Sequence, residues 1–307
     1  MQILSKKHKS INVSFFVLCW IIILFVNGCK KQIDNPEAVS YTDKRCTEID
    51  DLSNINKDEL LLVVLAGQSI ISGRGDLNDL PEDYRKCRED ILVFGNDYKW
   101  RYAKEPIDEA RNQVDMVSAD LNAAASPAVS FAMTYLEKNP GKRIVLIPCA
   151  KGGSLIEEWQ QNNSRTTLYG SCLYRFKLAM NHGQPLAMLF QQGESDAIAP
   201  EMLLPRKPKP VQWGMLFLKF VEDFRRDSGV ENLPVVYTRV GRNGNPERFV
   251  NWDIVKQSQD SVVDGTANLA IVYTDDLPLK DEVHYTTKGT ITLGERYSNK
   301  LQKLLAK

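Results

Sequence analysis

The stretch of sequence that decides the fold covers residues 60–69 and reads LLLVVLAGQS. Its first seven residues form an uninterrupted apolar run, which is typical of a β-strand buried on both faces. A glycine, an amide and a hydroxyl follow directly as Gly67, Gln68 and Ser69. The pattern predicts a central strand that ends in a polar turn.

Similar apolar runs recur further along the chain, at 144–149, 185–191, 233–238 and 268–274. Between and after them, apolar residues repeat at helical spacing within 129–136, 173–180, 213–224 and 293–305. Buried strands that alternate with helices imply a parallel sheet covered on both faces. We therefore expect an α/β fold with three α/β/α layers around a five-stranded parallel sheet.

Two segments break this alternation. Residues 74–125 form a long insertion after the first strand. Residues 197–210 contain four prolines, which remove backbone donors and stiffen the chain, so this segment is expected to be a loop. Both segments would follow strands at the same edge of the sheet. Substrate specificity is therefore expected to reside in them.

The N-terminus has the layout of a secretory signal, with basic residues at 6–9 and an apolar run at 13–26. Gly28-Cys29 resembles the end of a bacterial lipobox, in which cleavage precedes the cysteine and the cysteine is acylated. An uncleaved membrane anchor is the alternative, but it needs about 20 apolar residues. We expect a signal peptide at 1–28, a tether at 29–58 and a folded domain at 59–307. The protein would be lipid-anchored at Cys29 in a bacterial cell envelope, periplasmic or surface-facing.

Composition limits the classes of partner and site. Lys+Arg and Asp+Glu are equal at 39 each, so no bulk attraction to nucleic acid is expected. No C-x-x-C spacing occurs, which argues against a zinc or thioredoxin-like site, and we expect no metal. Beyond the signal and Cys29, four cysteines could form disulfides in an oxidising compartment. Their pairing stays open among Cys46, Cys87, Cys149 and Cys172.

The chain has only three histidines, which restricts any histidine base. His8 lies in the signal. His182 lies in a turn between a helix and the strand that follows, so it should lie at the amino edge of the sheet. His284 follows the last strand. Because sites in open α/β sheets lie beyond the carboxyl ends of the strands, His284 is the expected base.

Polar residues follow four of the predicted strands at that carboxyl edge: Ser69, Gly152, Gly153, Gln192, Asp281 and His284. Each alone is commonly a turn or helix-capping residue. Together they supply a nucleophile, a base, a carboxylate and hydrogen-bond donors, which acyl transfer requires. Their joint occurrence at one edge favours a hydrolase.

Each residue has a distinct expected role. Ser69 is a weak nucleophile and needs His284 to accept its proton. Asp281 would fix the imidazole tautomer. The oxyanion needs fixed N–H donors, which the Ser69 backbone, Gly152 or Gly153, and the neutral side-chain amide of Gln192 could provide.

Four ordered blocks then carry a resemblance to a known family: residues 67–75, 148–159, 192–196 and 281–289. Gly67-Gln68-Ser69 with Gly73-Arg74-Gly75, a Gly-Gly-Ser block, Gln-Gly-Glu-Ser-Asp, and Asp281-x-x-His284 resemble the sialate O-acetylesterase-like domain. This group includes carbohydrate esterase family 6 within the SGNH hydrolases.

The resemblance implies an SGNH-hydrolase (flavodoxin-like) fold and a Ser-Asp-His triad that deacetylates sugars with no metal or other cofactor. It also implies supporting roles for Gln68 and Glu194. Two positions depart from the usual family pattern. Ile70 replaces an Asn after the nucleophile, and Gln191 replaces a His before Gln192.

The leading hypothesis is a serine esterase that removes O-acetyl groups from carbohydrates, of the acetylxylan or sialic acid type. Ile70 and Gln191 motivate an alternative, a catalytically impaired surface glycan-binding protein of the same fold. A third hypothesis is an esterase for lipid or other acyl esters. The expected partners are an acetylated carbohydrate and a membrane, but no nucleic acid.

Overall fold

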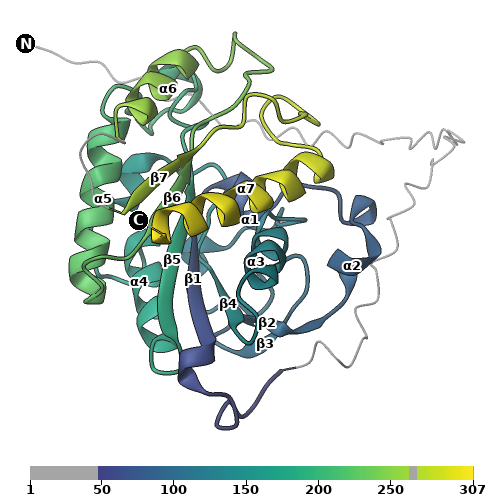
Figure 1. Ribbon diagram of the computed structural model, residues 1–307. Helices are drawn as coiled ribbons and strands as arrows, with labels where there is room; N and C mark the ends of the chain where they lie inside the picture. The colour runs from purple at the N-terminus through teal and green to yellow at the C-terminus, as the bar shows by residue number, and fades with distance from the viewer. Residues whose placement is uncertain (1–47, 263–267, 307) are drawn as a thin grey trace, which may run out of the picture. The chain divides into compact units, whose positions relative to one another are not determined.

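The computed structural model describes residues 48–262 and 268–306 (Figure 1). Within these ranges, no helix is both long enough and apolar enough to cross a bilayer. The expected signal peptide, Cys29 and Cys46 lie outside the described residues. The expectations about them therefore stay as predictions.

A seven-stranded sheet forms the centre of the described domain, in the order β3-β2-β4-β1-β5-β6-β7. The strands are β1 Leu60–Gly67, β2 Arg88–Phe94, β3 Trp100–Ala103, β4 Arg143–Pro148, β5 Gln184–Gln191, β6 Val235–Thr238 and β7 Leu269–Val272. All neighbouring pairs are parallel except β2 and β3, which pair antiparallel. The predicted α/β class and the five predicted strands are confirmed, with β1 in the middle of the sheet.

The prediction of only five strands was wrong by two, because β2 and β3 lie inside the insertion 74–125. β2 begins with the charged residues Arg88, Glu89 and Asp90, which leaves only four apolar residues in a row. β3 is a four-residue edge strand that is only partly buried. Neither strand presents the long apolar run that marks a strand buried on both faces.

Helices cover both faces of the sheet (Figure 1). They are α1 Ser69–Ser72, α2 Glu82–Arg85, α3 Ala128–Glu137, α4 Leu168–Ala179, α5 Trp213–Ser228, α6 Trp252–Asp260 and α7 Thr287–Leu305. The pair α3 and α7 packs on one face, while α4 and α5 pack on the other. The four predicted helices are confirmed, and α6 and the one-turn helices α1 and α2 are additions to them.

Strand β1 explains why both faces need a helical layer. Its side chains alternate between the two faces, and both sets are apolar. Leu62 and Val64 pack in the same core cluster as Phe220 of α5. Val63 and Leu65 pack with residues of α3 and α7 in a second cluster. Burying each such side chain stabilises the fold by roughly 1.5–3 kcal/mol, so exposing either face would be costly.

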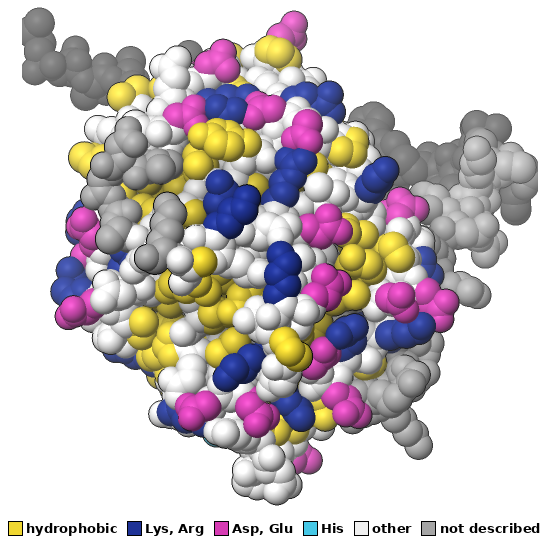
Figure 2. All heavy atoms as spheres, in the orientation of Figure 1, with side chains coloured by type: hydrophobic (Ala, Val, Ile, Leu, Met, Phe, Trp, Pro, Cys, Tyr) yellow, Lys and Arg dark blue, Asp and Glu magenta, His cyan; other side chains and the backbone are white. Residues whose placement is uncertain are grey.

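One face of the molecule shows a mixture of charges. On the face shown in Figure 2, basic and acidic side chains are interspersed with apolar ones. The equal totals of acidic and basic residues are consistent with this distribution.

At the carboxyl edge, β1 and β5 approach each other closely. Gly67 has φ +115°, and a Cβ there would lie 2.0 Å from the carbonyl oxygen of Gln191. Only glycine fits this position, because it has no Cβ and tolerates a positive φ. The chain can therefore turn from β1 directly into α1, which begins at Ser69.

One disulfide joins the carboxyl edge to a helix. Cys149, just after β4, is bonded to Cys172 of α4, with a Cα–Cα distance of 5.3 Å. Cys87 also takes part in a disulfide. The Cys149–Cys172 pairing was left open by the sequence, and it fixes the start of the loop that carries Gly152 and Gly153.

The last part of the predicted tether packs on the domain. Ile49 N–H donates to the carbonyl of Trp100 at 2.7 Å. Ile49, Leu52 and Ile55 lie against one of the two core clusters. The described residues 48–58 thus extend the domain next to its edge strand β3.

Candidate active site

Ser69, His284 and Asp281 meet at the carboxyl edge of the sheet. Ser69 Oγ lies 2.8 Å from His284 Nε2. His284 Nδ1 lies 2.8 Å from Asp281 Oδ2 and 3.1 Å from Oδ1. These distances allow a proton to pass from the serine to a histidine whose second nitrogen is held by a carboxylate. Ser69 is largely buried, with 6% of its surface exposed.

The sequence of the last loop explains how this pair is held. Asp281 Oδ1 accepts hydrogen bonds from the backbone N–H of Val283 and of His284, at 3.0 and 2.8 Å. Lys280 N–H donates to the carbonyl of His284 at 2.8 Å and closes the turn. Thr286 then caps α7 by accepting from Gly289 N–H. The Asp-x-x-His spacing therefore folds locally into a fixed carboxylate–imidazole pair.

The surroundings keep the imidazole neutral. Burial lowers the pKa of His284 below its ordinary value, and the charges of Arg74 and Lys280 lower it further. The hydrogen bond and charge of Asp281 oppose this shift without cancelling it. Burial alone would raise the pKa of Asp281, but the backbone and side-chain hydrogen bonds from the 283–284 turn hold it below its ordinary value. At neutral pH the site thus contains a neutral base next to a carboxylate.

Two backbone N–H groups near Ser69 are unused. Among the described residues, neither Ser69 N–H nor Gly153 N–H donates a hydrogen bond. The loop that carries Gly153 lies on the end of β1, because Lys151 N–H donates to the carbonyl of Gly67 at 2.9 Å. Both groups can therefore serve the oxyanion role predicted from the sequence.

Gly152 plays a different part from Gly153. Its N–H donates to Asp120 Oδ2 at 2.9 Å. The same oxygen accepts from Ser72 Oγ and from Arg74 Nη2, both at 2.7 Å. The site contains no room for a larger residue, since a Cβ on Gly152 would lie 2.4 Å from Arg74 Nη2. Gly152 thus anchors the loop through its N–H, while the N–H of Gly153 stays unused.

Asp120 joins three segments around the site, and the sequence reasoning missed it. Burial raises its pKa, but the hydrogen bond and charge of Arg74, with further hydrogen bonds from Ser72 and the Asn122 N–H, outweigh burial and hold the pKa below its ordinary value. The carboxylate connects the insertion to the chain after β1 and to the loop after β4. Asp120 lies in an irregular stretch with no motif around it, so only its partner Arg74, in the Gly73-Arg74-Gly75 block, gave a signal.

Gln192 lies at the predicted edge, but its side chain faces the interior. Its Nε2 donates to Asp196 Oδ2 at 2.7 Å and to the carbonyl of Ser154 at 2.9 Å. A third contact, at 3.2 Å, is to Gln68 Oε1. An amide nitrogen carries two hydrogens, so these three acceptors leave Gln192 no free donor.

The two departures from the family pattern are accommodated in the interior. Ile70 packs in the core cluster under α3 and α7. Gln191 Nε2 donates to Glu194 Oε1, and both residues are buried. Burial raises the pKa of Glu194 to about 7. Neither Ile70 nor Gln191 contacts Ser69, His284 or Asp281 through a hydrogen bond.

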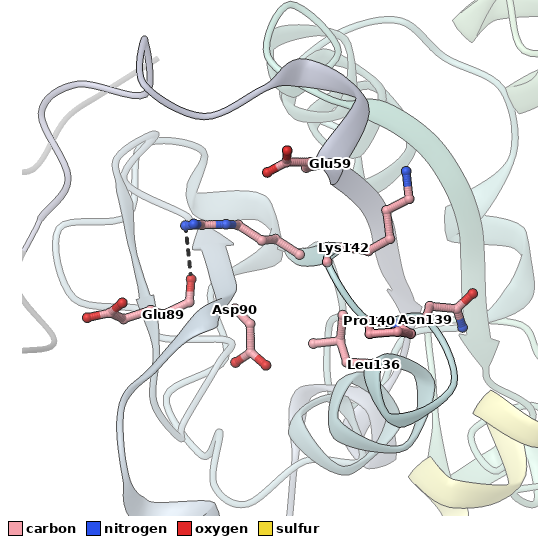
Figure 3. A pocket seen from close by; sticks show the side chains of 9 residues that line it. Glu59, Glu89, Asp90, Leu136, Asn139, Pro140 and Lys142 are labelled. Carbon is pink, nitrogen blue, oxygen red and sulfur yellow. Dashed lines mark hydrogen bonds between the residues drawn. The ribbon is translucent and has the colours of Figure 1, made fainter.

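The opposite, amino edge of the sheet lacks these groups. His182 is exposed there, and its ring packs against Trp100 at 5.3 Å between centroids. A hollow of about 480 Å³ also opens at this edge (Figure 3). It is lined by Glu59, Glu89, Asp90, Leu136, Asn139, Pro140, Gly141, Lys142 and Arg143. None of these is a serine or a histidine. A second hollow at this edge includes His182 and Ser53, but the Ser53 hydroxyl donates to Asp51 and not to the histidine, so the serine–histidine pair seen at the carboxyl edge is not repeated here.

A mostly parallel α/β sheet with this arrangement at its carboxyl edge is the architecture of a carboxylic ester hydrolase. The chain belongs to the family of carbohydrate esterases described as sialic acid-specific acetylesterases, whose family model matches residues 59–303. The resemblance seen in the sequence blocks is thereby confirmed.

Individual relatives agree with this assignment. A probable carbohydrate esterase of Arabidopsis thaliana is 25% identical over 248 residues, which cover 76% of this chain and 86% of the relative. The solved structure of that plant protein aligns with a TM-score of 0.64 at 23% identity, over 80% of this chain and 98% of its own. The structure of NanS aligns with a TM-score of 0.62 at 15% identity, over 82% of this chain and 99% of its own. The structure of a carbohydrate acetylesterase from Xanthomonas citri aligns with a TM-score of 0.56 at 15% identity, over 80% of this chain and 56% of its own.

Proposed function

We propose that this protein hydrolyses O-acetyl esters of carbohydrates, with Ser69 as nucleophile, His284 as base and Asp281 as the carboxylate that orients it. The observation that carries the proposal is the unbroken contact from Ser69 Oγ to His284 Nε2 and from His284 Nδ1 to Asp281, each at 2.8 Å. Membership of the acetylesterase family supports acetyl as the acyl group that is removed.

The reaction follows from these positions. His284 Nε2 accepts the Ser69 proton while Oγ attacks the acetyl carbonyl carbon. The N–H groups of Ser69 and Gly153 stabilise the oxyanion that forms. The tetrahedral intermediate expels the sugar oxygen, which takes the proton from His284. Water, deprotonated by the same base, then cleaves the acetyl-serine and releases acetate.

Hydrolysis of 4-nitrophenyl acetate tests the enzyme assignment. The purified protein should release nitrophenol, and Ser69→Ala should reduce the rate to near background. If the wild-type protein is folded but inactive, the alternative of a glycan-binding protein with an impaired site gains support, and binding to acetylated glycans becomes its test.

The substrate class is proposed as acetylated polysaccharide or sialic acid. An acyl-chain series tests the acyl group, because an acetylesterase should lose activity steeply beyond short chains, whereas a lipid esterase should not. A screen for acetate release from acetylated xylan, acetylated sialic acids and peptidoglycan tests the sugar. Release from none of them would reject the carbohydrate assignment.

We also propose that the protein is held at a membrane by a lipid on Cys29. The layout of residues 1–29 supports this, and the Cys149–Cys172 disulfide is consistent with an oxidising compartment. Cys29→Ser should release the protein from the membrane fraction. If the variant stays membrane-bound, the uncleaved-anchor alternative is correct.

A further inference from the structure

A relay of side-chain hydrogen bonds runs from the interior toward the nucleophile. It begins at Trp213, whose Nε1–H donates to Gln192 Oε1 at 2.6 Å. An indole N–H can only donate, so this bond fixes which end of the Gln192 amide is oxygen. Gln192 Nε2 must then face the other way, toward Asp196, Ser154 and Gln68.

The orientation of Gln68 follows from the same rule. Its Oε1 is approached by two donors, Gln192 Nε2 at 3.2 Å and Gly193 N–H at 3.4 Å. The Gly193 backbone N–H can only donate, so the oxygen of Gln68 occupies this position. Its Nε2 therefore points away from Gln192 and Gly193.

That nitrogen is unused. Among the described residues, Gln68 Nε2 has no hydrogen-bond acceptor, although Gln68 is only 2% exposed. It does not belong to the polar atoms that are sealed from solvent without a partner, so solvent reaches it. An amide nitrogen that solvent reaches and that has no protein acceptor can donate to water or to a bound ligand.

The backbone of Gln68 is firmly placed beside the nucleophile. Its N–H donates to the carbonyl of Gln191 at 2.7 Å, and its own carbonyl accepts from the N–H groups of Ile71 and Ser72. The next residue is Ser69. The unused amide nitrogen thus belongs to the residue directly before the nucleophile, at the strand end where the Ser69 and Gly153 N–H groups are also free.

We propose that Gln68 Nε2 is the side-chain donor to the oxyanion, the role that the sequence suggested for Gln192. The inference rests on the proposed esterase function. Gln192 is then a positioning residue, which together with Trp213 holds the Gln68 amide with its nitrogen toward the substrate. A neutral amide suits this role, because it stabilises the negative oxygen without carrying charge in the resting enzyme.

Two substitutions of Gln68 separate donation from packing. Gln68→Glu keeps an oxygen that can accept from Gln192 and Gly193, but replaces the donor with a carboxylate oxygen. Gln68→Met keeps the length and removes all hydrogen bonding. Gln161→Met is the matched control, because Gln161 is exposed and its side chain bonds only to Asp227.

The measurement compares 4-nitrophenyl acetate with its thionoacetate, in which sulfur replaces the carbonyl oxygen. Sulfur accepts hydrogen bonds poorly, so the rate ratio of ester to thionoester reports the oxyanion donors. In both Gln68 variants, kcat on the ester should fall on the order of 10²-fold with little change in KM, and the ratio should fall with it. The control should match the wild type.

General damage to the site would lower both rates and leave the ratio unchanged. A wild-type ratio in both Gln68 variants, with folding verified by circular dichroism, would overturn the inference. If the ester-to-thionoester rate ratio falls in Gln192→Met but keeps its wild-type value in the Gln68 variants, then Gln192 is the side-chain donor to the oxyanion. If the wild-type enzyme cleaves neither ester, the proposed function itself fails instead.

Discussion

The two edges of the sheet each carry a histidine, carboxylates and an opening to solvent, yet only one is organised for chemistry. At the carboxyl edge, His284 is partly buried and bonded on both ring nitrogens. At the amino edge, His182 is exposed and has only a ring contact with Trp100. The hollow in Figure 3 lies at this second edge.

The difference teaches that strand direction, and not the size of a hollow, locates the site. In a parallel sheet every strand delivers its following loop to the same edge. Ser69, Gly153 and His284 come from loops far apart in the sequence and meet there. The amino edge receives the chain from helices and turns, and its contacts, such as Arg143 Nη1 to the Glu89 carbonyl at 3.3 Å and Lys142 Nζ to the Asp58 carbonyl at 3.0 Å, tie segments together without pairing a serine with a histidine.

The largest expected effect separates the two histidines. His284→Ala should lower kcat/KM by roughly 10⁴-fold or more, because Ser69 loses the group that accepts its proton. His182→Ala should stay within about twofold of the wild type, as surface changes usually do. Ester hydrolysis by the two purified variants measures this. The reverse result would show that the site lies at the amino edge.

Asp281→Asn should have the next largest effect. An amide at this position can no longer stabilise the imidazolium and favours the wrong tautomer, so kcat should fall by roughly 10²–10⁴-fold with KM little changed. Steady-state kinetics with 4-nitrophenyl acetate test this. Near-wild-type kcat would mean that His284 is oriented by its loop alone.

A smaller effect is expected at Asp120, which ties the Gly152 loop to Arg74. Asp120→Asn removes the charge that pairs with Arg74, and kcat should fall by about 10–100-fold as Gly153 loses its fixed position. Asp90→Asn is the matched control, since Asp90 pairs with Arg88 and lines the amino-edge hollow. Equal losses in both variants would point to general destabilisation, which melting temperatures would reveal.

The smallest effect concerns pH. Because burial and nearby positive charges lower the pKa of His284, activity should be retained below pH 6.5 and be lost only as pH falls through that lowered pKa. Lys280 is exposed and contributes part of this shift. Lys280→Met should therefore move the acid limb of the kcat/KM profile slightly upward. A limb that does not move, or moves downward, would contradict the electrostatic account.

Much of the carboxyl edge could be predicted from the sequence. β1, β4 and β5 present apolar runs, and the residues that end them are read directly as Ser69, Gly152 and Gln192. His284 followed from elimination among three histidines. These features are local in sequence, so pattern and strand direction were sufficient.

Other features depend on contacts between distant segments. β2 and β3 are short and partly charged, so no periodicity marked them. Asp120 acquires its role only when the insertion folds onto Arg74 and Gly152. The inward orientation of the Gln192 amide is set by the indole of Trp213, which lies on another element. A sequence does not predict which way a side-chain amide is oriented, because its oxygen and nitrogen are placed by neighbours from distant segments.

The position of Asp120 has a consequence for how the enzyme can diversify. Asp120 is 5% exposed and fixed by three segments, while its neighbour Leu121 is 89% exposed. A constrained and an unconstrained position thus lie side by side at the rim of the site. Residue 121 can therefore change without disturbing the hydrogen bonds that Asp120 makes to Ser72, Arg74 and Gly152. Variation at the surface of this loop is thus separated, by a single peptide bond, from the contacts that hold the loop in place.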